Sequence, residues 1–166
     1  ENGMVKKDGE LCWEFDRLFQ EIKNGLKKCK EIGKIPVSMG VDTWGVDFVL
    51  MDKDDKVLGN TVGYRDHRNE GMDEEVYKTI SLEDLYARTG IQKAIFNTVY
   101  QLMAVKTKHP EYLEQAETML HVPDYFHYLL TGKKTCEYTE ATTGQLVNAE
   151  TKDWDYELID KLGYPR

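Results

Sequence analysis

Apolar residues recur at helical spacing near the start of the chain and then give way to short apolar runs. Between residues 15 and 32 they fall three or four positions apart, at Phe15, Leu18, Phe19, Ile22, Leu26 and Cys29. This spacing predicts an amphipathic helix, and Gly33 follows it as the residue that ends the helix. The short runs predict strands at Ile35–Val41, Val46–Met51 and Lys56–Val62, with a turn at 52–55 between the last two.

After residue 80 the pattern is mostly helical. Ser81 and Asp84 form a capping box for a helix at Leu82–Arg88, which Gly90 ends. The remaining pattern predicts helices at Thr98–Lys108, Asp124–Leu130 and Asp155–Leu162, and a strand at Thr118–Val122. Strands in front, with helices between and behind them, predict an α/β or α+β domain.

Composition and charge narrow the class of protein. A chain of 166 residues is one domain or part of a larger one. Its 40% hydrophobic and 31% charged residues are typical of a soluble globular protein, and no apolar run is long enough to cross a membrane. The net charge of −8 argues against a nucleic-acid surface, which would need a basic stripe. Cys12, Cys29 and Cys136 lack metal-ligand spacing, which favours reduced thiols in a cytoplasmic protein.

Several common catalytic patterns do not occur in the sequence. There is no Gly-x-Gly-x-x-Gly and no Gly-x-Ser-x-Gly, and the Walker spacing of Gly40 and Gly45 is not followed by Lys-Ser/Thr. The four histidines make no i, i+4 pair, which favours solvated or hydrogen-bonded histidines over a zinc site. The acidic turn at 52–55 has Val57 where a calcium loop needs glycine and Gly63 where it needs an acid, so a plain hairpin is expected.

Residues 41–51 carry the most unusual local chemistry. Trp44 and Gly45 interrupt a strand-like apolar run and are flanked by Asp42 and Asp47. The glycine allows a close approach to the backbone, the indole offers a flat apolar wall, and the carboxylates accept hydrogen bonds, so the segment suits a polyhydroxylated ligand. A glycine-kinked hairpin with solvent-facing acids explains the same residues, because an isolated glycine in a strand often marks only a bulge.

Three further segments carry polar residues that a purely structural chain would not need. Tyr64–Arg68 reads Tyr-Arg-Asp-His-Arg, which fits either a ligand-binding rim or a solvated charged loop. Asn97, after Phe96, and Asp124, after Pro123, both stand at predicted helix starts. Helix N-capping is the simpler interpretation for both, although the Asn97 amide could also face a cleft.

Seven motifs, in a fixed order, give these segments a common context. They are Gly40–Phe48 (Gly-Val-Asp-Thr-Trp-Gly-Val-Asp-Phe), Tyr64–Arg68 (Tyr-Arg-Asp-x-Arg), Thr89–Ile91, Phe96–Leu102 (Phe-Asn-Thr-x-Tyr-Gln-Leu), Pro123–Tyr125, Leu130–Gly132 and Glu137–Thr143. In this order and spacing they resemble the N-terminal domain of FGGY carbohydrate kinases, within the ribonuclease-H-like, actin-like ATPase fold. Within that family the motifs resemble rhamnulokinases, with L-fuculokinases as the nearest rival.

The resemblance implies a fold and an activity. Residues 1–166 would form a single partial domain, on the sugar-binding side of a truncated α/β ribonuclease-H-like kinase domain. The parent protein would be a phosphotransferase that uses ATP and Mg²⁺ to convert L-rhamnulose to L-rhamnulose 1-phosphate. The alternatives are L-fuculokinase or another FGGY sugar kinase and, from a different class, a non-catalytic binding module. That last alternative leaves the ordered motifs unexplained.

The resemblance also implies which residues bind the sugar. The residue that matches Gly45 contacts the sugar, and Trp44, Asp42 and Val46 are its candidate neighbours. Arg65 and Asp66, and likewise Phe96 and Asn97, are expected to approach the same pocket. No catalytic, cofactor-binding or metal-binding residue is assigned. The phosphate-binding hairpin, the catalytic Asp and the adenosine-binding domain are expected to lie outside this chain, whose two ends look cut. The isolated chain is therefore expected to be inactive.

The expected partners follow from the same interpretation. The parent would bind a small-molecule sugar, with no nucleic acid and no membrane as partner. Without the first strands of the sheet, one sheet edge would be exposed, and an unpaired edge invites pairing with another copy. A homodimer through this edge is therefore expected.

Overall fold

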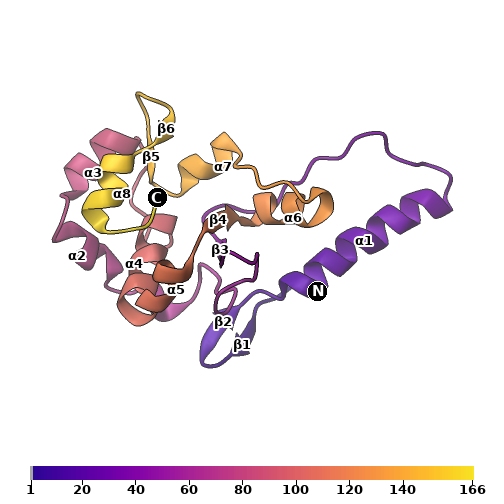
Figure 1. The fold of residues 1–166 in the computed structure, drawn as a ribbon, viewed down its shortest axis with the longest axis horizontal. Coiled ribbons are helices and arrows are strands. Elements are labelled where there is room, and N and C mark those ends of the chain that lie inside the picture. The colour runs from indigo at the N-terminus through magenta and orange to yellow at the C-terminus, as the bar shows by residue number, and fades with distance from the viewer. Residues whose placement is uncertain (1) are drawn as a thin grey trace.

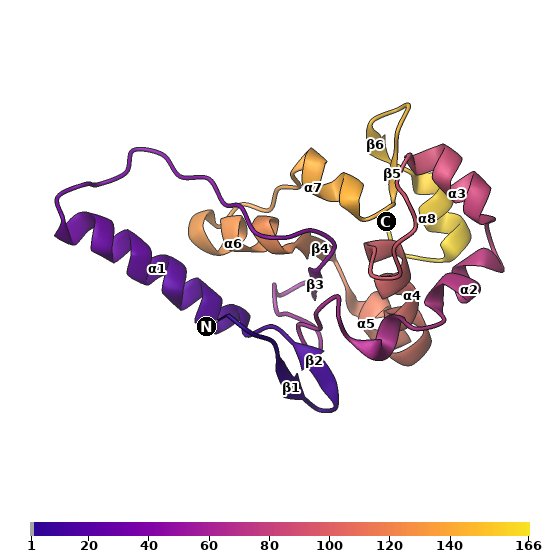
Figure 2. The same cartoon turned by 180° about the vertical axis from the view of Figure 1, so that it is seen from behind.

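The computed structural model describes residues 2–166 and shows a helical body from which one long helix, α1, projects (Figure 1). Figure 2 shows from behind that β3 and β4 lie between this body and α1. The elements are β1 (Val5–Lys7), β2 (Glu10–Cys12), α1 (Phe15–Glu31), β3 (Phe48–Met51), the 3₁₀ turn η1 (His67–Asn69), α2 (Met72–Tyr77), α3 (Leu82–Thr89), α4 (Thr98–Lys108), α5 (Pro110–Gln115), β4 (Thr118–His121), α6 (Val122–Thr131), α7 (Tyr138–Thr143), β5 (Val147–Asn148), β6 (Asp153–Trp154) and α8 (Tyr156–Leu162).

Strand β3 is the element that joins the two parts of the core. It pairs antiparallel with β4, and all of its residues are buried. Phe48 and Leu50 pack into the apolar core of the helical body, whereas Val49 and Met51 pack into a second cluster that includes Phe15 of α1. Burial on both faces explains why the sequence of β3 is a continuous apolar run rather than an alternating one.

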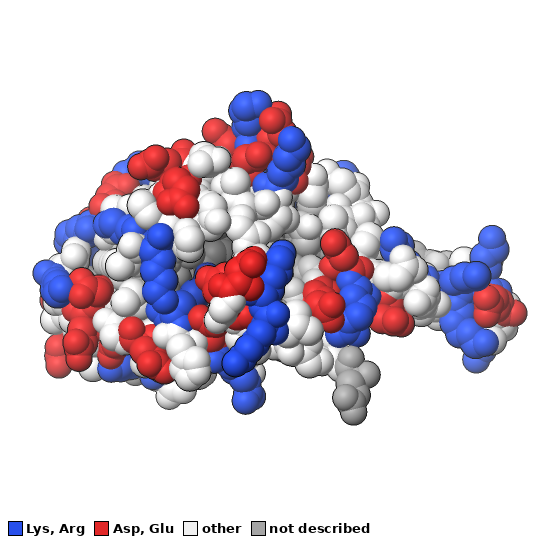
Figure 3. Space-filling model, turned by 90° about the horizontal axis from the view of Figure 1, so that it is seen from below, with Lys and Arg blue, Asp and Glu red and all other residues white. Residues whose placement is uncertain are grey.

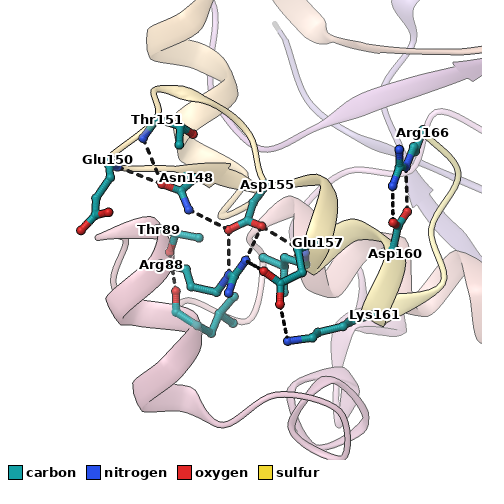
Figure 4. Close-up of polar contacts among 12 residues, drawn as sticks. Arg88, Thr89, Asn148, Glu150, Thr151, Asp155, Glu157, Asp160, Lys161 and Arg166 are labelled. Carbon is teal, nitrogen blue, oxygen red and sulfur yellow. Dashed lines mark hydrogen bonds and ion pairs between the residues drawn. The ribbon is translucent and has the colours of Figure 1, made fainter.

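An ion pair ties the two helices α3 and α8 together (Figure 4). Arg88 on α3 donates from Nε and Nη2 to the two carboxylate oxygens of Asp155, at 2.8 and 2.7 Å. The same carboxylate caps α8, because its Oδ1 accepts from the backbone N–H of Leu158 at 3.1 Å. A single buried side chain therefore both starts α8 and fixes it against α3.

Most of the predicted helices are confirmed. Helix α4 has the predicted bounds, and α1 ends one residue before the predicted end. Helix α3 begins as predicted, with the Ser81 hydroxyl accepting from the backbone N–H of Asp84 at 3.0 Å. Strand β4 and the turn at 52–55 are also confirmed, and the Asp52 carboxylate stabilises that turn by accepting from the backbone N–H of Asp54 and Lys56.

The predicted strand at Ile35–Val41 is wrong. None of these residues makes a backbone hydrogen bond with another described residue, and the side chains of Ile35 and Val37 are 70% and 103% exposed. The alternating apolar pattern is present, but a strand also needs a neighbour to complete its hydrogen bonds, and none lies beside it in residues 2–166. The predicted strand at 56–62 is likewise reduced to isolated bridges at Val57 and Val62.

The two predicted N-caps are also corrected. Helix α6 begins at Val122, which places Asp124 inside its first turn, and the Asp124 carboxylate accepts instead from the backbone N–H of Glu137 at 3.0 Å. Asn97 does stand at the N-cap position of α4, but its side chain makes no capping bond. Both side chains are used to join distant segments, which local sequence could not indicate.

Charged residues of both signs are interspersed on the face seen in Figure 3, rather than gathered into a stripe of one sign. Among the helices of the described chain, none combines the length and the apolar character that a membrane-spanning helix requires.

Candidate functional site

A hollow of about 780 Å³ lies where four segments of the chain meet. These are the segment before β3, the loop before η1, the loop between α3 and α4, and the end of α7. The lining residues are Trp44, Gly45, Val46, Tyr64, Tyr86, Gly90, Ile91, Gln92, Ala94, Phe96, Asn97 and Thr143. The hollow therefore has aromatic and apolar walls with a few polar groups between them, as pockets for small ligands usually do.

A strained turn presents Gly45 to this hollow. Val46 has a φ of +68°, and the N–H of Asp47 donates to the carbonyl of Gly45 at 2.9 Å. This is a γ-turn with a β-branched residue in the left-handed region, which is rare because its Cβ crowds the backbone. Three bonds hold it: the Val46 N–H donates to Thr143 Oγ1 at 3.3 Å, and the Val46 carbonyl accepts from Thr98 Oγ1 at 2.8 Å and Gln101 Nε2 at 3.2 Å.

Gly45 has little room for a side chain, because Thr143 lies close to it. A Cβ built on it would lie 3.0 Å from Thr143 Oγ1 and 3.3 Å from the Thr143 Cβ. The backbone of Gly45 therefore forms the pocket wall itself, and a ligand can approach it closely.

The buried carboxylate of Asp47 sets the position of the aromatic wall. It accepts from Trp13 Nε1 at 2.7 Å, from Trp44 Nε1 at 3.0 Å and from Gln101 Nε2 at 2.9 Å. Burial raises the pKa of Asp47, and these three hydrogen bonds oppose the rise. The two indole rings are in contact, with their centroids 4.4 Å apart and their planes tilted by 39°. The expectation that Asp47 offers an acceptor to a ligand or to solvent is therefore wrong, because its side chain is buried and holds the indoles.

The opposite wall comes from the loop before α4. Phe96 is 41% exposed and meets Tyr64 edge-on, with ring centroids 5.6 Å apart. Asn97 is buried, and its amide donates to the Gln92 carbonyl at 3.0 Å and to Gln145 Oε1 at 2.9 Å. Asn97 thus fixes the loop that carries Gln92 along the rim.

Five of the predicted binding residues line the hollow together: Trp44, Gly45, Val46, Phe96 and Asn97. The structure places the other three outside its lining. Arg65 is exposed and packs over the Tyr64 ring, and Asp66 accepts from the backbone N–H of Leu11 at 2.6 Å and of Arg68 at 2.7 Å. Asp42 lies in the next hollow.

Sequence reasoning did not assign seven lining residues, of which four have polar side chains: Tyr64, Tyr86, Gln92 and Thr143. Tyr64 and Thr143 stand within two of the seven motifs, so a signal for them was present. The sequence carried no signal for Tyr86 and Gln92, because the packing of α3 and of the loop after it brings them to the hollow.

A second hollow, of about 560 Å³, is lined by Thr139 and Glu140, one turn of α7 before Thr143. Its lining includes Asp42, Asp124, Glu137 and Glu140. Burial raises the pKa of Asp124, and burial together with the charges of Asp124 and Glu137 raises the pKa of Glu140 to about 7. No three or more His, Cys, Asp or Glu side chains converge on a point within residues 2–166 in a way that would cage a metal ion.

Comparison with known proteins gives this geometry a family context. Residues 2–166 match the N-terminal domain of the FGGY family of carbohydrate kinases. The chain is 57% identical over 164 residues to a rhamnulokinase of Halalkalibacterium halodurans, and 51% identical over the same length to one of Oceanobacillus iheyensis. These matches cover 99% of the chain and 35% of each relative, so the chain spans about a third of their length.

Solved structures show the same fold. A xylulose kinase from Rhodospirillum rubrum superposes with a TM-score of 0.88 at 19% identity, covering 99% of this chain and 35% of that one. A gluconate kinase from Lactobacillus acidophilus gives 0.81 at 21% identity, covering 99% and 34%. The predicted α/β fold of a sugar-kinase N-terminal domain and the resemblance drawn from the motifs are both confirmed.

Proposed function

Because the chain belongs to the FGGY family of carbohydrate kinases, we propose that it forms the sugar-binding wall of a kinase that phosphorylates L-rhamnulose. The observation that carries this proposal is the strained turn at Gly45 and Val46, whose backbone forms one wall of the hollow beside aromatic rings. Five of the predicted binding residues line this hollow. Strain of this kind persists only where surrounding contacts enforce it, and it clusters at functional sites.

The lining offers the contacts that a sugar needs. Trp44, Tyr64 and Phe96 present apolar ring surface to the carbon skeleton, and Gly45 lets the hydroxyl groups come close to the backbone. Tyr86 and Gln92 add polar side chains at the rim. These residues would bind and orient the sugar, and such positioning is, together with electrostatic stabilisation, the main contribution of a protein to phosphoryl transfer.

The phosphoryl donor is proposed to be ATP with Mg²⁺, which would neutralise charge on the phosphates when bound. Residues 1–166 are assigned as a single partial domain on the sugar side, and no residue among them is assigned as the catalytic base. Asp47 is unsuited to that role, because its carboxylate is buried and fully engaged with Trp13, Trp44 and Gln101. A cytoplasmic location is proposed, since ATP is the donor.

The test of this proposal is Gly45→Ala, with sugar binding measured by calorimetry on the longest available form of the protein. The added methyl group would press on Thr143 and fill space beside the wall, so L-rhamnulose affinity should fall about tenfold or more, or by at least 1.4 kcal/mol. The control is Gly25→Ala in α1, where a Cβ meets nothing within 4 Å.

Unchanged L-rhamnulose binding in Gly45→Ala would sink the assignment of this wall. L-fuculose and other ketoses in the same experiment separate the rhamnulokinase proposal from the other FGGY sugars. A protein that binds none of these sugars would favour the non-catalytic binding module.

A homodimer is also proposed. The support is the segment 35–41, whose backbone bonds to no described neighbour and whose Ile35 and Val37 side chains are exposed. Such a segment can pair with its copy in a second chain. Light scattering at high concentration should give a dimeric mass; a monomeric mass would contradict the proposal.

A further inference from the structure

Gln101 connects the two walls of the hollow that Gly45 and Phe96 line, which we call the sugar hollow. Gln101 is fully buried on α4 and does not line the hollow itself. Its amide nitrogen, Nε2, donates to the Val46 carbonyl at 3.2 Å and to Asp47 Oδ1 at 2.9 Å. The carbonyl of Phe96, on the opposite wall, lies 3.0 Å from the same nitrogen. One buried amide therefore contacts the strained turn, the carboxylate that holds the indoles, and the loop before α4.

The oxygen of the same amide meets a charged donor. Arg68, in the turn η1, donates from Nη2 to Gln101 Oε1 at 3.0 Å. The Nε of Arg68 is buried and has no hydrogen-bond partner among residues 2–166. Burial lowers the pKa of Arg68, and the charges of Glu10 and Asp47 oppose that change. A hydrogen bond from a charged donor is stronger than one between neutral groups, so this contact holds the amide firmly.

The contacts at the two ends of the amide favour the same orientation. If the amide of Gln101 were turned over, its oxygen would face the Asp47 carboxylate and its N–H groups would face the Arg68 guanidinium. Acceptor would then meet acceptor and donor would meet donor, which is unfavourable in a buried site. Arg68 itself does not line the sugar hollow; it lines another one, with Phe48 and Leu50. It therefore acts on the sugar hollow from outside.

We propose that Arg68 is a positioning residue for sugar binding, which fixes both walls of the sugar hollow by holding the Gln101 amide in one orientation. Without Arg68, the buried Oε1 of Gln101 would lose its donor, and the amide would hold the two walls less firmly. Sugar binding would then have to order the walls as well, which lowers affinity. The effect on the sugar rests on the proposed function; the connection from Arg68 through Gln101 to Asp47 does not.

The test is a double-mutant cycle of Arg68→Met and Gln101→Met on the longest available form of the protein. Calorimetry measures L-rhamnulose affinity. Nuclear magnetic resonance follows the assigned indole N–H signals of Trp13 and Trp44, which both donate to Asp47. Each single substitution should shift both signals and weaken L-rhamnulose binding about fivefold or more, which is the scale of one hydrogen bond. Because Arg68 acts through Gln101, the double variant should bind L-rhamnulose no more weakly than Gln101→Met alone.

Arg17→Met is the matched control, because Arg17 is an exposed arginine of α1 that lines neither hollow. It should leave the affinity and both indole signals unchanged. Two results would overturn the inference: losses of affinity that add in the double variant, or wild-type affinity and indole signals in Arg68→Met.

Circular dichroism checks that each variant folds. If Arg68→Met unfolds, Arg68→Lys replaces it in the cycle, since lysine keeps the charge but not the planar fork that carries Nη2, and the same non-additivity is expected. If the wild-type protein binds no L-rhamnulose, the proposed function fails. The indole signals then decide the role of Arg68 by themselves, because they report on Asp47 without any sugar.

Discussion

Replacing Asp155 by alanine should lower the free energy of unfolding by about 3 kcal/mol. The carboxylate is 3% exposed, and it receives both Nε and Nη2 of Arg88, whose side chain is 26% exposed (Figure 4). Removing one partner of a buried pair costs about 3–5 kcal/mol, because the other charge stays behind. In the variant, the Arg88 guanidinium would remain partly exposed to solvent and paired with Glu157, at 2.8 Å. The free energy lost with the ion pair should therefore lie below that range. Loss of the α8 cap adds about 1 kcal/mol.

Urea unfolding followed by far-ultraviolet circular dichroism measures this loss. With a slope of about 2 kcal/mol per molar urea, the midpoint should fall by about 1.5 M. Asp155→Asn keeps an acceptor for the Leu158 N–H and should lose less. Glu157→Gln leaves the Arg88–Asp155 pair intact and should change the midpoint little, because the Glu157 side chain is 62% exposed.

The pH dependence offers a second check on the same pair. The hydrogen bond from Arg88 lowers the pKa of Asp155 in the folded chain. The contribution of the Arg88–Asp155 pair to the free energy of unfolding is therefore complete above the unfolded-state pKa of about 3.9, and it is lost as the pH falls through the folded-state pKa of Asp155. The difference between wild type and Asp155→Asn should shrink in strong acid. A midpoint shift in Asp155→Ala no larger than that in Glu157→Gln would refute the reasoning.

Other parts of the fold give equally direct expectations. Burial lowers the pKa of His121 from 6.5 to about 4, so as the pH falls the imidazole of the unfolded chain is protonated before that of the folded chain. Between pH 6.5 and about 4 the free energy of unfolding should therefore decrease with falling pH, by at most about 1.4 kcal/mol per pH unit. In urea titrations, His121→Asn should reduce this dependence on pH. Leu85→Ala empties a fully buried site and should cost about 2–5 kcal/mol by the same assay. Asp47→Ala leaves the indole N–H groups of Trp13 and Trp44 without their acceptor, so it should shift tryptophan emission and weaken L-rhamnulose binding; unchanged emission would contradict the role given to Asp47.

Local signals were sufficient for the five longer helices α1, α3, α4, α6 and α8, whereas the six-residue helices α2, α5 and α7 were not predicted. Helix α4 has an apolar sequence up to Val105 and a proline at position 110, and its bounds are those predicted. Helix α3 begins after Ser81, whose side chain caps it, and ends at Gly90, which has a positive φ, as predicted. These signals act over a few residues and so can be read along the chain. The strand predicted at 35–41 failed because strand formation depends on a neighbour that lies elsewhere.

The sequence by itself determined the family, through seven ordered motifs, and it marked Trp44–Val46 as a candidate binding segment, which the structure places in the lining of one hollow. Only the tertiary structure decided how that wall is built. A β-branched residue rarely adopts a positive φ, yet Val46 does so. Its backbone is held by hydrogen bonds to Thr98, Gln101 and Thr143, which come from elements far along the chain. Such bonds form only when distant segments pack together, so no local pattern records them.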